Sequence, residues 1–233
     1  MSSEPRMVLI TGAAGHLGRA VAARFAQAGD RLLLVDRQAE ALEAAFGSGG
    51  AHQLVAVDLL DSAGSLSALG AALQRAGRVE VVCHLAGGFR MGEAVHETTD
   101  HGWALMVDLN ARSLVNVARA VVPHLIAQGG GKIVTVGAFA AQKGQARMGA
   151  YCASKSALIR LTEAMSAELK EHGINVNCVL PTLIDTADNR AAMPEDDPAR
   201  WVSPQALAEV IAFLGSEAAR AVHGAALPVT GLS

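Results

Sequence analysis

A phenol and an ammonium group have the types and spacing best suited to proton transfer in this sequence. Tyr151 and Lys155 stand four residues apart in the segment Tyr–Cys–Ala–Ser–Lys, a spacing that places two side chains on one face of a helix. A nearby cation stabilises a phenolate, so we expect Lys155 to lower the pKa of Tyr151 from its reference value of about 10. The phenol would then exchange a proton near neutral pH.

The same spacing also occurs in helical pairs that only face solvent, and in an arbitrary sequence that interpretation would be preferred. Two features favour chemistry here. Tyr151 is the only tyrosine of a chain in which 3% of the residues are aromatic. It also lies downstream of a glycine-rich turn, at a distance that suits the fifth strand-to-strand crossover of an α/β fold.

Three glycines follow the apolar run Val8–Thr11 in the spacing G-x-x-G-x-x-G and open a segment of helical composition. A strand, a glycine turn and a helix N-terminus together can bind the pyrophosphate of a dinucleotide, since glycine allows a tight turn and a close approach of the phosphate. An ordinary strand-to-helix turn is the alternative, and for the histidine of the turn a local role is favoured over a cofactor contact. The candidate cofactor residues of this turn are Gly12, Gly15, His16, Leu17 and Gly18.

An acidic residue stands where the ribose of a dinucleotide would be held. Asp36 ends the second apolar run, 24 residues after Gly12, close to where a carboxylate accepts hydrogen bonds from the adenosine ribose. A carboxylate would repel a 2′-phosphate, so the sequence favours NAD, used as NADH, over NADP. Arg37 keeps NADP open, because a neighbouring guanidinium can bind that phosphate.

Short apolar runs alternate with Ala-rich helical patterns over the whole chain. This alternation predicts an α/β fold, a single-domain Rossmann-type doubly wound parallel sheet of about seven strands flanked by helices. The predicted strands are Met7–Thr11, Arg31–Asp36, His52–Asp58, Val79–Leu85, Lys132–Gly137, Ile174–Leu180 and Ala225–Val229. The predicted helices are Gly15–Gly29, Gln38–Phe46, Ser62–Ala76, Asp100–Gln128, Gly149–Gly173 and Pro204–Ser216.

We expect residues 1–233 to form one domain, because the length suits one sizeable core. The stretch Pro181–Trp201 shows no clear periodicity and is rich in Pro, Asp and Asn. It follows the carboxyl end of a predicted strand, where doubly wound folds bind ligands. We therefore expect a substrate loop at about residues 181–201 that acts as a mobile lid.

Composition excludes several classes of partner. The net charge is −3 without clustered Lys and Arg, so neither nucleic acid nor a membrane surface is an expected partner. The eight histidines show no metal-ligand spacing and the three cysteines form no C-x-x-C, so we predict no metal site and no disulfide. No signal-peptide stretch and no run of about 18 apolar residues occurs, which favours a soluble cytoplasmic protein.

Taken together, these motifs resemble the short-chain dehydrogenase/reductase family over the full length of the chain. The matching pieces are Thr11–Gly18, Asp36, Asp58–Leu59, Ala86–Gly87, Asn110, Tyr151 with Lys155, Pro181–Thr186 and His223–Gly231. The resemblance implies an NAD(P)-dependent oxidoreductase with a small-molecule substrate. It also implies a homodimer or homotetramer that pairs helices of the stretches 100–128 and 149–173.

The resemblance assigns roles to individual residues. Asn110 would support Lys155 through the helix backbone and a water, and Lys155 would also hold the nicotinamide ribose. The implied catalytic residues are Tyr151, Lys155 and Asn110. Beyond the glycine turn and Asp36–Arg37, the implied cofactor residues include Asp58 at the adenine, Ala86 and Gly87 on the adenine-ribose side, and Leu183, Ile184 and Thr186 at the carboxamide. The others are Leu59, Gly88, Tyr151, Lys155 and Pro181.

Three positions depart from the pattern of that family. His16 stands where the turn usually has a glycine, and His84–Leu85 replace an asparagine doublet. Ala138 stands thirteen residues before Tyr151, where the family usually has a serine whose hydroxyl binds the substrate carbonyl. Removing such a donor costs about two to three orders of magnitude in rate.

One branch of the family, the dihydropteridine reductases, lacks this serine, and the sequence resembles that branch. Ala86–Phe89 corresponds to its Ala-Gly-Gly-aromatic segment, and residues 179–201 correspond to its substrate loop. The implied reaction transfers a hydride from NADH to a quinonoid dihydropterin with a proton from Tyr151. In the substrate site, Ala138 would leave room for the ring, Phe89 would stack on it, and Asn189 would supply a polar contact.

Two other functions remain open. The first is a carbonyl/alcohol oxidoreductase of the general short-chain family that works without the serine. The second is a catalytically inactive dinucleotide-binding sensor, which the lost serine and asparagines would suit. The retention of Asn110, Tyr151 and Lys155 weighs against a sensor, because a protein that only binds a dinucleotide needs no proton donor.

Overall fold

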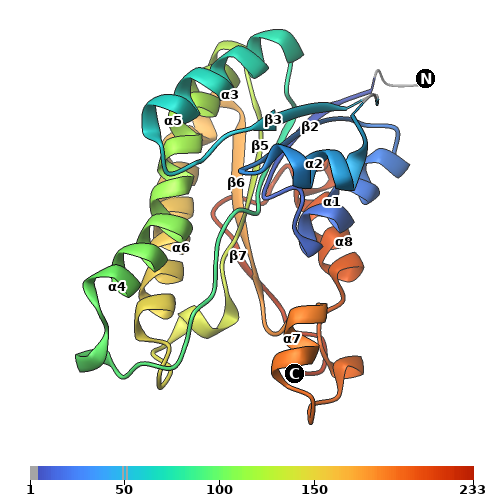
Figure 1. Ribbon diagram of the computed structural model, residues 1–233. Helices are drawn as coiled ribbons and strands as arrows, with labels where there is room; N and C mark the ends of the chain where they lie inside the picture. The colour runs from blue at the N-terminus through green and yellow to red at the C-terminus, as the bar shows by residue number, and fades with distance from the viewer. Residues whose placement is uncertain (1–4, 49, 51) are drawn as a thin grey trace.

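A parallel sheet lies between two layers of helices in the computed structural model, which describes residues 5–48, 50 and 52–233 (Figure 1). Its seven strands are ordered β3-β2-β1-β4-β5-β6-β7 and all pair in parallel. The strands are β1 (Met7–Thr11), β2 (Arg31–Asp36), β3 (Gln53–Ala56), β4 (Val81–His84), β5 (Gly131–Val136), β6 (Ile174–Pro181) and β7 (Ala226–Val229). The helices are α1 (His16–Gln27), α2 (Ala39–Phe46), α3 (Ser62–Ala76), α4 (Asp100–Val107), α5 (Ser113–Ala127), α6 (Gly149–Leu169), α7 (Ala187–Ala192) and α8 (Pro204–Leu214). The predicted fold class is therefore confirmed.

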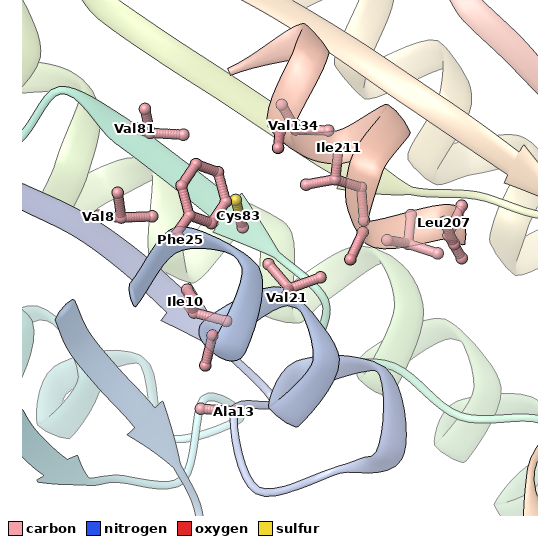
Figure 2. Packing of buried hydrophobic residues seen from close by; sticks show 14 of the residues in the cluster. Val8, Ile10, Ala13, Val21, Phe25, Val81, Cys83, Val134, Leu207 and Ile211 are labelled. Atoms are coloured by element: carbon pink, nitrogen blue, oxygen red, sulfur yellow. The ribbon is translucent and has the colours of Figure 1, made fainter. Parts of the chain in front are cut away.

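The central strands are apolar on both faces because helices cover both. Every residue of β1, β4 and β6 is buried, as parallel strands with right-handed helical crossovers require. On one face α1 and α8 pack over the sheet, and Figure 2 shows Phe25 of α1 beside Val8 and Val81, and Ile211 of α8 beside Val134. Helices α3, α5 and α6 cover the opposite face.

The strand order reverses between β1 and β4, which neighbour each other although two strands separate them in sequence. At such a point the loops that follow the two neighbouring strands run to opposite faces of the sheet. A crevice therefore opens between them, beyond the carboxyl ends of the strands. Thr11 pairs with His84 at these strand ends. The fold thus brings the glycine turn after β1 next to the segment that follows β4.

The helix predicted over Asp100–Gln128 is interrupted. Helix α4 ends at Val107, a π turn spans Asp108–Arg112, and α5 begins at Ser113. One extra residue per turn moves side chains out of the ordinary helical register, and such turns often occur at functional sites. The turn contains Asn110, which is fully buried, so the interruption belongs to the site described below.

The stretch at residues 181–201 is more regular than its sequence suggests. Thr186 caps the short helix α7, its hydroxyl accepting a hydrogen bond from the amide of Asn189. Ile184 forms an isolated parallel bridge with Val202. Figure 1 places α7 and the C-terminus side by side, beyond the carboxyl ends of the strands. The stretch without clear periodicity thus contains a capped helix of six residues, too short to show a period, and the substrate loop itself stays a prediction.

In the described part of the chain, no helix combines the length and the apolar character needed to cross a membrane.

Candidate active site

A cavity of about 630 Å³ opens at the carboxyl ends of the strands. It brings together segments that follow β1, β2, β3 and β4 and the π turn. Its lining residues are Gly12, Ala14–Gly18, Asp36–Gln38, Ala41, Val57–Leu60, Leu85–Gly87, Leu109 and Ser113. Most of the cofactor residues predicted from the first half of the sequence therefore face one space.

The glycine turn needs its glycines for two different reasons. Gly12 has a positive φ of 66°, and a Cβ there would lie 2.9 Å from the amide nitrogen of Ala86. Gly18 is packed against the turn itself, so a Cβ would overlap the carbonyl oxygen of Gly12. Gly15 is the N-cap of α1. The start of α1 thus borders the cavity, and the first amides of a helix, which have no partner within it, suit an anion.

Asp36 has a structural task besides any contact with ribose. Its Oδ2 accepts a hydrogen bond from the amide of Ala14 at 2.9 Å, and its Oδ1 accepts one from the amide of Arg37 at 2.7 Å. The carboxylate is half-buried, whereas Arg37 is exposed. Asp36 thus fixes the glycine turn to the end of β2 and still presents free lone pairs and a negative charge to the cavity.

Tyr151 and Lys155 lie on the first turns of α6, as predicted. The Lys155 side chain is buried, and its Nζ donates a hydrogen bond to the carbonyl oxygen of Val136 at 2.8 Å. The Tyr151 ring is met edge-on by Phe89, with ring centroids 4.8 Å apart and an interplanar angle of 86°. The Phe89 ring therefore packs against the phenol ring.

The predicted lowering of the Tyr151 pKa is wrong for the protein alone. Burial raises the pKa of the phenol to about 12, with a smaller contribution from Cys152. Burial also lowers the pKa of Lys155 to about 8. Loss of hydration is the largest cause of both shifts.

Asn110 connects the π turn to both neighbouring segments. Its Oδ1 accepts a hydrogen bond from the amide of Gly88 at 2.9 Å. Its Nδ2 donates to the carbonyl of Gly88 and to the hydroxyl of Ser154, each at 3.0 Å. A Cβ on Gly87 would lie 2.8 Å from Asn110 Oδ1 and 3.1 Å from Lys155 Nζ. Asn110 and Lys155 therefore flank Gly87, and the link between them runs through side chains as well as backbone.

No side-chain hydroxyl stands in the place of the usual serine. Ala138 is buried in extended backbone just after β5. The nearest hydroxyl in that strand belongs to Thr135, which hydrogen-bonds Thr162 of α6 at 2.8 Å and is fully buried. Since Thr162 donates its own proton to Leu158, Thr135 is the donor of the pair and has no proton left for a ligand.

The predicted residues of the lid lie outside the cavity lining. Thr186 is engaged in capping α7, and the Asn189 side-chain amide donates to the carbonyl of Ile184 at 2.7 Å. In the part of the chain that the structure describes, one Nδ2 hydrogen and Oδ1 of Asn189 thus have no protein partner. His16 of the glycine turn lies 4.0 Å from Asp188 of α7, which places α7 beside the turn.

Two polar residues of this region were not predicted as site residues. His84 is buried between Thr11 and Ser113 and hydrogen-bonds both, and Ser113 lines the cavity. The only sequence feature that pointed to His84 was that it stands where the family pattern has an asparagine. Within the described residues, no group of three or more His, Cys, Asp or Glu side chains is placed to hold a metal ion.

The residues present suit a nicotinamide dinucleotide. The cavity has the size of a nucleotide site, a glycine turn and a helix N-terminus suit a pyrophosphate, and the Asp36 carboxylate suits the ribose hydroxyls. The Lys155 ammonium lies beside Gly87, at the border of this cavity.

Comparison with known proteins agrees with this geometry. The sequence pattern of the family described as short chain dehydrogenase matches residues 6–197. D-threitol dehydrogenase of Mycolicibacterium smegmatis is 31% identical over 239 residues, which cover 97% of this chain and 92% of that protein. Carveol dehydrogenase of Mycobacterium avium in complex with NAD has 27% identity and a TM-score of 0.87, covering 97% of this chain and 96% of the other. A putative NAD(P)-dependent gluconate 5-dehydrogenase of Beutenbergia cavernae with bound NADP has 30% identity and a TM-score of 0.87, covering 98% and 97%.

Proposed function

Because the chain belongs to the short-chain dehydrogenase/reductase family, we propose that it is an NAD(P)-dependent oxidoreductase that interconverts a small carbonyl compound and its alcohol. The observation that carries this proposal is that the Lys155 ammonium lies beside Gly87, a residue of the 630 Å³ cavity lining, while Tyr151 stands one helical turn earlier on α6. Relatives named for threitol and carveol support an alcohol as the substrate class more than they support a dihydropterin.

The chemistry divides between cofactor and protein. A bound dinucleotide supplies or accepts the hydride. Tyr151 donates its proton to the substrate oxygen during reduction and takes it back during oxidation. A phenol whose pKa is about 12 stays protonated at neutral pH, which suits proton donation and hence the direction of reduction.

Lys155 and Asn110 hold the geometry for this transfer. Lys155 presents a positive charge near the phenol, and that charge stabilises the phenolate left after proton donation. Asn110 fixes Gly88 and, through Ser154, the first turn of α6. Since Ala138 offers no hydroxyl, Tyr151 alone would bind the substrate oxygen from the protein side, so a reactive or preoriented substrate is favoured.

A quinonoid dihydropterin is a second candidate substrate, favoured by two observations. Ala138 leaves the wall of the site without a hydroxyl, which a flat ring does not need. Phe89 is 56% exposed and makes a T-shaped contact with Tyr151, so its exposed surface can stack on such a ring. In this proposal Asn189 would contact the pterin through Oδ1 or through the Nδ2 hydrogen that does not bond Ile184.

A substrate screen separates these two candidates and the binding-only sensor. Oxidation of NADH and NADPH is followed with aliphatic ketones, diketones, quinones and quinonoid dihydrobiopterin, using wild type and Tyr151→Phe. Turnover of ketones that is lost in the variant supports the carbonyl reductase, and turnover of the pterin alone supports the second candidate. Tight dinucleotide binding without turnover of any compound would contradict both and favour the sensor.

We propose NAD as the preferred dinucleotide, because the Asp36 charge faces the cavity and disfavours a 2′-phosphate. The exposed guanidinium of Arg37 keeps NADP as the alternative. A cytoplasmic homodimer or homotetramer also remains a proposal that rests on the family. Light scattering of the purified protein tests the oligomeric state.

A further inference from the structure

A buried imidazole links two walls of the cavity. His84 ends β4 and is 1% exposed. Its Nδ1 lies 3.0 Å from Thr11 Oγ1 at the end of β1, and its Nε2 lies 3.3 Å from Ser113 Oγ, just after the π turn. The ring thus spans from the strand that leads into the glycine turn to the segment that holds Asn110.

Counting protons around the ring fixes its tautomer. The Ser113 hydroxyl donates to the carbonyl of Leu109 at 2.6 Å, so toward His84 it can only accept, and Nε2 must carry the hydrogen. The Thr11 oxygen already accepts from the amides of Leu85 and Ala86 at 3.2 and 3.3 Å. Its own proton is therefore free for Nδ1, which must be an acceptor.

We propose that His84 is a positioning residue: fixed with its proton on Nε2, it holds the Thr11–Leu85–Ala86 wall against the Leu109–Ser113 wall and thereby sets the shape of the cofactor cavity. Both walls line that cavity. The inference rests on the proposed function for its catalytic consequence, whereas the tautomer and the order of the two walls are properties of the protein alone.

Each end of the ring has a separate consequence. The Thr11 end orders the Leu85 and Ala86 amides, and Ala86 packs directly over Gly12. Loss of the hydrogen bond between His84 and Thr11 would loosen the wall that a dinucleotide contacts. The Ser113 end orders the Leu109 carbonyl within the π turn, where Asn110 supports Gly88 and Ser154. Loss of the hydrogen bond between His84 and Ser113 would disturb the catalytic residues more than the binding of the dinucleotide.

Two substitutions separate the ends. In His84→Asn, Oδ1 takes the place of Nδ1 and accepts from Thr11, but the side chain is too short for Ser113. In His84→Gln, the amide nitrogen takes the place of Nε2 and donates to Ser113, but Thr11 loses its acceptor. Both variants keep a polar group at the site, which limits the cost of burial.

The first measurement uses the protein without cofactor. Nitrogen-15 NMR of the imidazole should show a protonated Nε2 and an unprotonated Nδ1 for His84. Hydrogen exchange at the Leu85 and Ala86 amides should be about three- to tenfold faster in His84→Gln than in wild type, as expected for one lost hydrogen bond, and little changed in His84→Asn. Protonation at Nδ1, or equal exchange in all three proteins, would overturn the proposal.

The second measurement follows the cofactor. The NADH dissociation constant, from quenching of protein fluorescence, should rise by about three- to tenfold in His84→Gln, while His84→Asn should mainly lower kcat. Ser113→Ala is the matched control, because it removes the same hydrogen bond from the other side. It should lower kcat when made alone, and it should not lower kcat further when combined with His84→Asn. A wild type that binds no NADH would remove the proposed function and leave the NMR result to decide the role of His84. Additive effects of Ser113→Ala and His84→Asn would contradict the role of the Ser113 end.

Discussion

The Lys155 ammonium donates its hydrogen bond to the carbonyl of Val136 at the end of β5 and makes none to Tyr151, one helical turn earlier on α6. The residue that carries the positive charge is thus held by the sheet, while the proton donor is held by its own helix and by Phe89. Burial raises the pKa of Tyr151 to about 12 and lowers the pKa of Lys155 to about 8.

The pH dependence of reduction should report Lys155. Its pKa is lowered to about 8 by burial, so the group is charged below that pH and loses its charge as the pH rises through it. Because a charged Lys155 stabilises the phenolate that Tyr151 leaves behind, kcat/KM for reduction should be level from about pH 6 to about pH 7.5 and fall above about pH 8. Lys155→Met should give a low, flat profile. If kcat/KM of Lys155→Met still fell above about pH 8, the fall would have to come from another titrating group.

Removal of the Tyr151 hydroxyl should abolish proton donation and spare cofactor binding. Tyr151→Phe is expected to lower kcat by about two to four orders of magnitude, the usual contribution of a general acid, and to change the NADH dissociation constant by less than about threefold. The ring contact with Phe89 is retained in the variant, so its melting temperature should stay near that of wild type. Activity within about tenfold of wild type would remove Tyr151 from the mechanism.

A hydroxyl introduced at position 138 should distinguish the two proposed substrates. Ala138→Ser adds the donor that ordinary carbonyl reductases of the family use, so kcat/KM for a ketone should rise by about tenfold or more. Turnover of a quinonoid dihydropterin should not rise, since that ring gains nothing from the donor. Ala141 is buried in the same cluster as Ala138, so Ala141→Ser is the control for the added volume and polarity. Equal gains for both variants would contradict the reasoning.

The choice of dinucleotide should depend on Asp36. Asp36→Asn keeps an oxygen that can accept from the Ala14 amide but removes the negative charge, and Arg37 then faces the 2′-position unopposed. The ratio of kcat/KM for NADH to that for NADPH should fall by about tenfold or more, roughly the effect of one charged hydrogen bond. Arg37→Gln alone should leave NADH use unchanged. A preference for NADPH in the wild type would overturn the NAD assignment.

Acid should destabilise the protein through His84. Burial, together with a smaller effect of Lys155, lowers the pKa of this imidazole to about 3, whereas in the unfolded chain it titrates near 6.5. The stabilising contribution is therefore complete above about pH 6.5 and is lost as the pH falls toward 3, with a slope of up to about 1.4 kcal/mol per pH unit. Denaturant unfolding between these pH values measures it. His84→Asn should flatten the dependence, whereas His96→Asn, at an exposed position, should leave it as in wild type.

Local signals in the sequence determined the fold and much of the site. Strand and helix patterns are each visible within a few neighbouring residues. Their alternation along the chain therefore predicts a parallel sheet, even though the sequence does not say which elements pack together. The glycine spacing of the turn and the position of Asp36 depend on backbone geometry within one strand–turn–helix unit. Tyr151 and Lys155 depend on a single helical turn. These features could be predicted because each depends on residues that are close together in the sequence.

Only the tertiary structure decided features in which distant segments meet. The π turn that carries Asn110, 22 residues from Gly88, is held by side-chain bonds to that segment and to α6, and its sequence reads as continuous helix. The link from Thr11 through His84 to Ser113 joins residues more than seventy and nearly thirty positions apart. The pKa of Tyr151 rose although its spacing from Lys155 predicted a fall, because burial is a property of the packed molecule and not of the spacing.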